Sequence, residues 1–150
     1  YGFHTTLIES SMVINDSQPE YIVKRAMHIL NRHKKAINGA RVLMLGIAYK
    51  NDIDDYRESP AVRVWKELKK VNADVDYYDA FVPVFSNMYG ESGKSIPELT
   101  PEIIAGYDLV IITTAHHNVD YSMVQKNAKT VFDTKNVMKA VTPRDNIEVL

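Results

Sequence analysis

The chain contains no cysteine, and this absence removes several kinds of chemistry. Disulfide bonds, thiolate nucleophiles and cysteine-ligated zinc sites are excluded within its 150 residues. A chain without cysteine is compatible with a cytoplasmic protein, which is the location we expect. No apolar run approaches the roughly 20 residues that span a bilayer. No segment has the charged start, apolar middle and small-residue cleavage site of a signal peptide. The sequence therefore predicts no membrane partner.

An excess of charge of either sign is also lacking. Lysine and arginine total 18 and aspartate and glutamate total 19, which gives a formal net charge of −1. This balance provides neither the basic surface that nucleic acid requires nor a polybasic stripe for anionic lipid. Hydrophobic residues make up 45% of the chain, enough for a core at this length. We therefore expect one domain, or one domain with an attached helical segment, and no nucleic-acid partner.

The first 38 residues predict a helical linker or dimerisation segment. The chain begins at Tyr1 in what already has the pattern of mid-helix sequence, so we expect a fragment of a longer protein. Pro19 predicts a kink or a break between two helices, and Ser17 is a candidate cap for the second one. Gly39 is the candidate helix exit. One helical face is apolar, and its members are Ile22, Ala26, Ile29 and Leu30.

Residues 39–150 alternate between predicted strands and predicted helices. The expected strands are 41–46, 75–78, 109–113 and 131–132. The expected helices begin at Ser59-Pro60 and cover 101–105 and 121–127. This alternation predicts an α/β domain, a Rossmann-like open parallel sheet with flanking helices. Ligands of such sheets bind beyond the carboxyl ends of the strands, which indicates three loops, 46–58, 113–118 and 133–136.

The segment 46–60 contains the residues best suited to binding a ligand. It leaves a buried strand through glycine and enters a helix, whose first turn offers free amides and a partial positive charge for phosphate. Lys50 and Arg57 add full charges, and Tyr49 presents a ring for a base or a sugar. The alternative is a solvated loop whose charges are balanced by acidic neighbours. Those neighbours are Asp52, Asp54, Asp55 and Glu58.

The same segment resembles the signature of the UDP-glucose/GDP-mannose dehydrogenase family. The matching positions are Gly46, Tyr49, Lys50, Asp55, Arg57, Glu58, Ser59 and Pro60. Further stretches resemble the family's later strands, at 75–79, 111–116 and 131–136. Ala80 stands where the family usually has proline, and Lys135 replaces an arginine, which keeps the charge but loses the planar fork. Residues 14–23 resemble the helix before the domain, in a variant most similar to members acting on UDP-N-acetylhexosamines.

The resemblance implies an NAD-dependent UDP-sugar 6-dehydrogenase, in which a C6 alcohol is oxidised twice to a carboxylate. It implies that this chain is the UDP-binding part of a protein that dimerises through its long helical segment. The implied substrate contacts are Tyr49, Lys50, His116 and Lys135, and the implied contact with NAD is Arg57. NAD and the catalytic cysteine would belong mainly to an amino-terminal domain that this chain lacks. No catalytic residue is therefore expected here, and the chain alone is expected to be inactive.

Parts of the sequence also suggest other functions. A non-catalytic dimerisation or regulatory module would keep only the nucleotide cleft, and a flavodoxin-like signalling domain would need a phosphoacceptor at Asp79 or Asp133. The run 90–95 suggests a P-loop, but position 88 is Met88 instead of the required glycine. His116 and His117 suggest a metal site, but neighbouring residues at a strand exit point in opposite directions, so no metal is expected.

Overall fold

The computed structural model describes residues 18–57, 59–87 and 90–150. A helix over residues 18–32 precedes the sheet domain. The elements that follow are β1 (Arg41–Leu45), α2 (Pro60–Lys70), β2 (Asp74–Tyr78), β3 (Val84–Ser86), β4 (Ser92–Lys94), α3 (Pro101–Ala105), β5 (Leu109–Ile112), α4 (Tyr121–Asn127), β6 (Val131–Asp133) and β7 (Ile147–Val149). Within the described part of the chain, no helix is both long enough and apolar enough to cross a membrane.

The main sheet has five parallel strands in the order β2-β1-β5-β6-β7. Met44 on β1 lies opposite Tyr77 on β2 and opposite Ile111 on β5. The chain moves from β1 outward to β2 and then returns to the other side of β1 to form β5. The loops after β1 and β5 therefore diverge, which is the topological switch point where open α/β sheets bind ligands. The predicted parallel α/β fold is confirmed.

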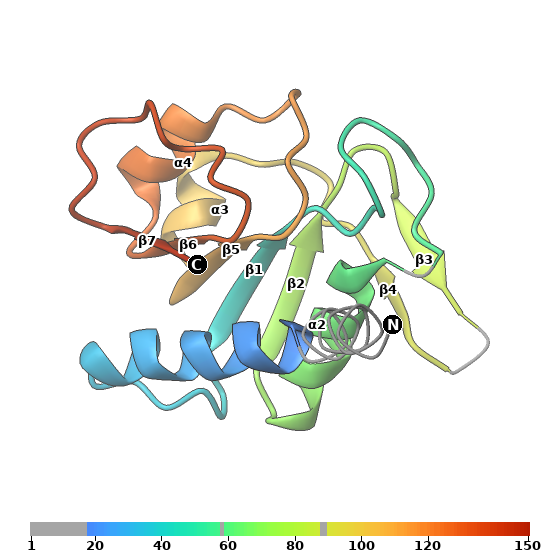
Figure 1. Ribbon diagram of the computed structural model, residues 1–150, viewed down its shortest axis with the longest axis horizontal. Coiled ribbons are helices and arrows are strands. Elements are labelled where there is room, and N and C mark those ends of the chain that lie inside the picture. Colours follow the sequence, from blue (N-terminus) through green and yellow to red (C-terminus); the bar gives the residue numbers. More distant parts are fainter. Residues whose placement is uncertain (1–17, 58, 88–89) are drawn as a thin grey trace, which may run out of the picture.

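Both faces of the sheet are covered, and alternate side chains of β1 enter two different cores. Val42 and Met44 pack with α2 and the helix 18–32, whereas Leu43 and Leu45 pack with residues of α3 and α4. Figure 1 shows α3 and α4 on one side of the sheet and α2 with the helix 18–32 on the other. Burial on both faces explains why β1 and β5 are continuous apolar runs.

The first helix ends at residue 32, before the predicted exit at Gly39. Lys34 adopts a left-handed φ of 60°. The Lys35 amide donates to the Leu30 carbonyl at 3.0 Å and the Lys34 amide to the Asn31 carbonyl at 3.0 Å. These are the bonds of a Schellman motif, which terminates a helix even without glycine. Gly39 instead lies in the loop that follows, and the proposed cap Ser17 lies outside the described residues.

A small antiparallel hairpin, β3–β4, lies in the stretch 80–100, which was expected to be irregular. Its Phe85 ring packs edge-on against Trp65 and lies 5.5 Å from the Tyr77 ring, centroid to centroid. A Cβ at Gly93 would come within 2.6 Å of the Phe85 ring, so the glycine makes room for this aromatic packing. β4 is a strand of a hairpin, not a turn into a helix, which excludes the P-loop.

Candidate functional site

A cavity of about 450 Å³ lies at the carboxyl edge of the sheet. Each of the three predicted ligand loops contributes to its wall, and α2, the helix 18–32 and the C-terminal end complete it. The lining residues are Gln18, Ile22, Tyr49, Pro60, Ala61, Arg63, Val64, Thr113, Thr134, Lys135 and Leu150. Segments that are far apart in the sequence thus meet at the topological switch point.

The cavity brings together two of the residues selected from the sequence, Tyr49 and Lys135. Lys50 does not line the cavity but lies beside it, with its ammonium nitrogen 5.7 Å from the centre of the Tyr49 ring. Arg57 lies away from the cavity, with its side chain 85% exposed and its Nε 3.1 Å from Asp55 Oδ1. Loop 46–58 therefore presents an aromatic ring to the cavity and a lysine beside that ring, whereas Arg57 is exposed elsewhere on the loop.

Arg63 lines the cavity but was not selected from the sequence. It lies in the first turns of α2, and Lys135 lines the same cavity. The position of Arg63 four residues after the capping serine, Ser59, is the feature of the sequence that indicates a place near the start of the helix. A guanidinium there adds a second positive charge suited to phosphate.

The first turn of α2 does not offer the free amides that were expected of it. Pro60 has no N–H group, and the Ala61 amide donates to Ser59 Oγ at 3.2 Å. The Val62 amide donates to the Ser59 carbonyl at 3.1 Å. The positive groups at this wall are therefore the side chains of Arg63 and Lys135.

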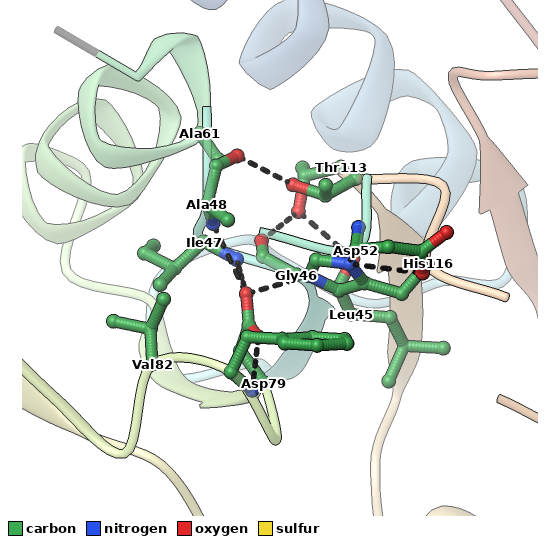
Figure 2. Close-up of polar contacts among 12 residues, drawn as sticks. Leu45, Gly46, Ile47, Ala48, Asp52, Ala61, Asp79, Val82, Thr113 and His116 are labelled. Carbon is green, nitrogen blue, oxygen red and sulfur yellow. Dashed lines mark hydrogen bonds and ion pairs between the residues drawn. The ribbon is translucent and has the colours of Figure 1, made fainter. Parts of the chain in front are cut away.

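The start of loop 46–58 is fixed by the buried carboxylate of Asp79, at the end of β2 (Figure 2). Asp79 Oδ2 accepts hydrogen bonds from the amides of Ile47 at 2.8 Å and Ala48 at 3.0 Å, and Oδ1 accepts one from Phe81 at 2.9 Å. Burial acts to raise the pKa of this carboxyl. The hydrogen bonds from His116 and from the two amides outweigh burial, so the pKa lies below its ordinary value.

His116, a predicted substrate contact, is not among the residues that line the cavity. Its ring is 2% exposed and packs against Phe81, with 4.9 Å between ring centres. Its Nε2 lies 2.9 Å from Asp79 Oδ2, and its Nδ1 accepts from the Asp52 amide at 2.7 Å. His117, by contrast, is exposed and pairs with the Asp52 carboxylate. Among the described residues, no group of three or more histidine, aspartate or glutamate side chains is placed to hold a metal ion.

Asp133 at the end of β6 builds the loop that carries Lys135. Its buried carboxylate accepts hydrogen bonds from the amides of Lys135 at 3.1 Å, Val137 at 3.2 Å and Met138 at 2.9 Å. The Asp79 carboxylate is also buried, and both of its oxygens accept hydrogen bonds from backbone amides. Neither carboxylate presents an exposed oxygen that could be phosphorylated, which removes the support for a flavodoxin-like signalling domain.

Comparison with known proteins finds relatives that are similar in sequence and in fold. Residues 43–140 match the family model described as the UDP-glucose/GDP-mannose dehydrogenase family, UDP binding domain. The UDP-N-acetyl-D-glucosamine 6-dehydrogenase of Pseudomonas aeruginosa is 31% identical over 115 residues, which cover 77% of this chain and 26% of that protein. A UDP-N-acetyl-D-mannosamine dehydrogenase of Methanococcus maripaludis is 29% identical over 140 residues, covering 88% of this chain and 30% of that one.

Solved structures of such enzymes share the fold. A UDP-D-ManNAc dehydrogenase from Pyrococcus horikoshii superposes with a TM-score of 0.73 at 23% identity, over 95% of this chain and 32% of that one. The UDP-N-acetyl-mannosamine dehydrogenase of Staphylococcus aureus superposes with a TM-score of 0.66 at 30% identity, over 99% and 33%. This chain thus spans between a quarter and a third of the length of these relatives.

Proposed function

Because this chain belongs to the UDP-glucose/GDP-mannose dehydrogenase family and contains its UDP binding domain, we propose that the cavity at the sheet edge binds the UDP part of a nucleotide sugar. On this proposal the whole protein is an NAD-dependent 6-dehydrogenase that oxidises the C6 alcohol of a UDP-N-acetylhexosamine, or of UDP-glucose, to the uronate. The names of the relatives support this substrate class.

The convergence of Tyr49, Arg63 and Lys135 on one cavity is the observation that carries the proposal. A diphosphate brings negative charge that the guanidinium and the ammonium group can pair with, the arginine in bidentate fashion. The exposed ring of Tyr49 offers a face for the base or the ribose. Lys50, next to that ring, adds a further positive charge at the rim. The role of this chain is to bind and orient the substrate.

The described residues do not fit a site for NAD. A dinucleotide cradle needs glycines that let a pyrophosphate approach the backbone. The space where a Cβ of Gly46 would lie is occupied by Thr114, whose own Cβ would be 2.3 Å away, so this glycine serves packing. We therefore assign NAD, which accepts the hydride, mainly to parts of the whole protein outside this chain. Arg57 is the one contact with it that we propose here. The chain also has no cysteine to act as nucleophile, so we expect it to be inactive alone.

We also propose that the protein forms a homodimer through its N-terminal helical segment. The helix 18–32 leaves Tyr21 47% and Met27 41% exposed. A groove of about 720 Å³ runs between this helix and the end of α2, and its apolar lining includes Val23, Ile37 and Val71. Exposed apolar surface of this kind is typical of an interaction site.

A thermal-shift experiment with UDP tests the nucleotide proposal. A ligand that binds only the folded state stabilises it by about 1.4 kcal/mol when its free concentration is ten times Kd, which corresponds to a few degrees in Tm. We expect millimolar UDP to raise the Tm, and we expect Lys135→Ala to remove most of this increase.

The matched control is Lys126→Ala, which removes an exposed lysine from the last turn of α4, remote from the cavity. It should leave the response to UDP unchanged. If UDP does not raise the Tm, or if both variants respond like the original chain, the cavity is not the UDP site.

A further inference from the structure

His116 connects three separate parts of the chain behind the cavity. Its ring lies between the end of β2, which provides Asp79, and the tip of loop 46–58, which provides the Asp52 amide. Its own carbonyl accepts a hydrogen bond from the Tyr121 hydroxyl on α4 at 2.7 Å. The ring is buried, and each of its two nitrogens has a hydrogen-bond partner within the protein. Figure 2 shows His116 directed toward Asp79 and Asp52.

These partners determine which ring nitrogen carries the proton. A backbone amide can only donate, so Nδ1, which lies 2.7 Å from the Asp52 nitrogen, must offer its lone pair. The proton is therefore on Nε2, where it is donated to Asp79 Oδ2 at 2.9 Å. The ring is a neutral bridge with one acceptor and one donor.

The bridge and the Asp79 carboxylate hold the two ends of one short segment. Asp79 Oδ2 also accepts from the Ile47 and Ala48 amides at the start of the loop, while His116 Nδ1 holds Asp52 at its tip. Between them, the Tyr49 amide donates to the Asp55 carbonyl at 2.6 Å. Tyr49 and Lys50 therefore lie between fixed points on both sides.

We propose that His116 is a positioning residue for the nucleotide site: its imidazole places Tyr49 and Lys50 by holding the Asp52 amide. This inference rests on the proposed function for the identity of the ligand. Loss of the ring nitrogens should therefore free the tip of the loop and weaken the binding of a UDP-sugar.

Amide hydrogen exchange and nitrogen-15 NMR of the histidine rings test the bridge without any ligand. We expect the Nε2–H tautomer for His116 at neutral pH. His116→Phe keeps a ring but removes both nitrogens, and with them the acceptor for the Asp52 amide, so the protection of that amide should fall about tenfold. The matched control, His117→Phe, should leave this protection nearly unchanged. An Nδ1–H tautomer, or unchanged protection in a folded His116→Phe chain, would overturn the proposal.

The affinity for UDP-N-acetylglucosamine provides the second readout. We expect His116→Phe to raise Kd about fivefold, the effect of losing the hydrogen bond that holds the Asp52 amide. His117→Phe should leave Kd nearly unchanged. If a folded His116→Phe chain binds with the original Kd, the ring does not position Tyr49 and Lys50 for the ligand. If the original chain binds no UDP-sugar, the proposed function fails, and the exchange experiment still decides the role of His116.

Discussion

At Gly46 the chain leaves β1 with a φ of 100°, a conformation that L side chains rarely adopt. A Cβ at this position would lie 2.3 Å from Thr114 Cβ and 2.9 Å from its backbone nitrogen. Thr114 cannot move away easily, since its hydroxyl donates to the Ala48 carbonyl at 2.9 Å. The glycine thus lets loop 46–58 and the loop after β5 pack against each other, which brings Tyr49 and Thr113 to one cavity.

Gly46→Ala should therefore destabilise the fold strongly. We expect a loss of about 3 kcal/mol, the sum of backbone strain and a clash that requires backbone movement. Gly39→Ala is the matched control, because Gly39 also has a positive φ, 82°, but nothing lies within 4 Å of its Cβ position. That variant should lose only the strain, about 1 kcal/mol. Urea unfolding measures both, and equal losses would contradict the packing role of Gly46.

The sequence predicted some residues of the site and not others, for physical reasons. Tyr49 and Lys135 follow predicted strands at their carboxyl ends, and parallel strands bring those ends to one edge. The burial of His116 depends on a partner, Asp79, from another strand end, which no local pattern reveals. Arg63 was passed over because a charged residue in a helix is usually solvated. The roles of His116 and Arg63 depend on which loops lie close together in the fold. The sequence alone does not give those distances.

Among the elements, α2 is the one that connects the fold to the cavity. Its capping residue, Ser59, accepts from the Ala61 amide and donates to the Ala48 carbonyl at 3.2 Å. The same hydroxyl therefore starts the helix and holds loop 46–58 against it. The cap is buried, so its hydrogen bonds are not easily replaced by water.

Ser59→Ala should lower the free energy of unfolding by about 1–2 kcal/mol and also weaken UDP binding. Thr100→Ala is the control, since Thr100 caps α3 in the same way, through the Ile103 amide, whereas Ser59 also donates to the Ala48 carbonyl of loop 46–58. Its loss of stability should be about 1 kcal/mol without any change in UDP affinity. Chemical denaturation and isothermal titration calorimetry separate the two effects. Equal UDP affinities in both variants would show that the Ser59 bond to the loop is not needed.

The elements that sequence patterns predicted are those with a strong local signal. β1 and β5 are continuous apolar runs because both faces are covered, and α2 and α3 start with a capping residue followed by proline. β3, β4 and β7 have only three residues each, too few to show a period. The first helix is followed by Lys34 in the left-handed conformation, a helix stop that lysine does not favour. Tertiary packing, and not a local sequence pattern, determines where these short strands form and where the first helix ends.

In the molecule as a whole, the helix 18–32 covers one face of the sheet and also reaches the last strand. Arg25 donates to the Val149 carbonyl at 2.8 Å, and Arg32 lies 2.5 Å from Glu148. Figure 1 shows this helix lying across one end of the molecule, near the labelled C-terminus. Its inner face belongs to the core, whereas Met27 and Tyr21 remain exposed.

Sedimentation should detect the proposed dimer. We expect the mass of a dimer at high micromolar concentration, and Met27→Glu should shift the equilibrium to the monomer by placing a charge in the apolar interface. Lys129→Glu, an exposed change after α4, serves as the control and should remain dimeric. A monomer at every accessible concentration would contradict dimerisation through this segment.

The most direct test of the central claim is a titration of the nitrogen-15-labelled chain with UDP, followed by NMR. We expect the largest shifts at the amides of Tyr49, Arg63, Thr134 and Lys135, which surround the cavity at the switch point. Residues of the groove beside the helix 18–32, such as Met27 and Val71, should not respond. Shifts confined to that groove, or no shifts at millimolar UDP, would contradict the claim that this sheet edge binds the nucleotide.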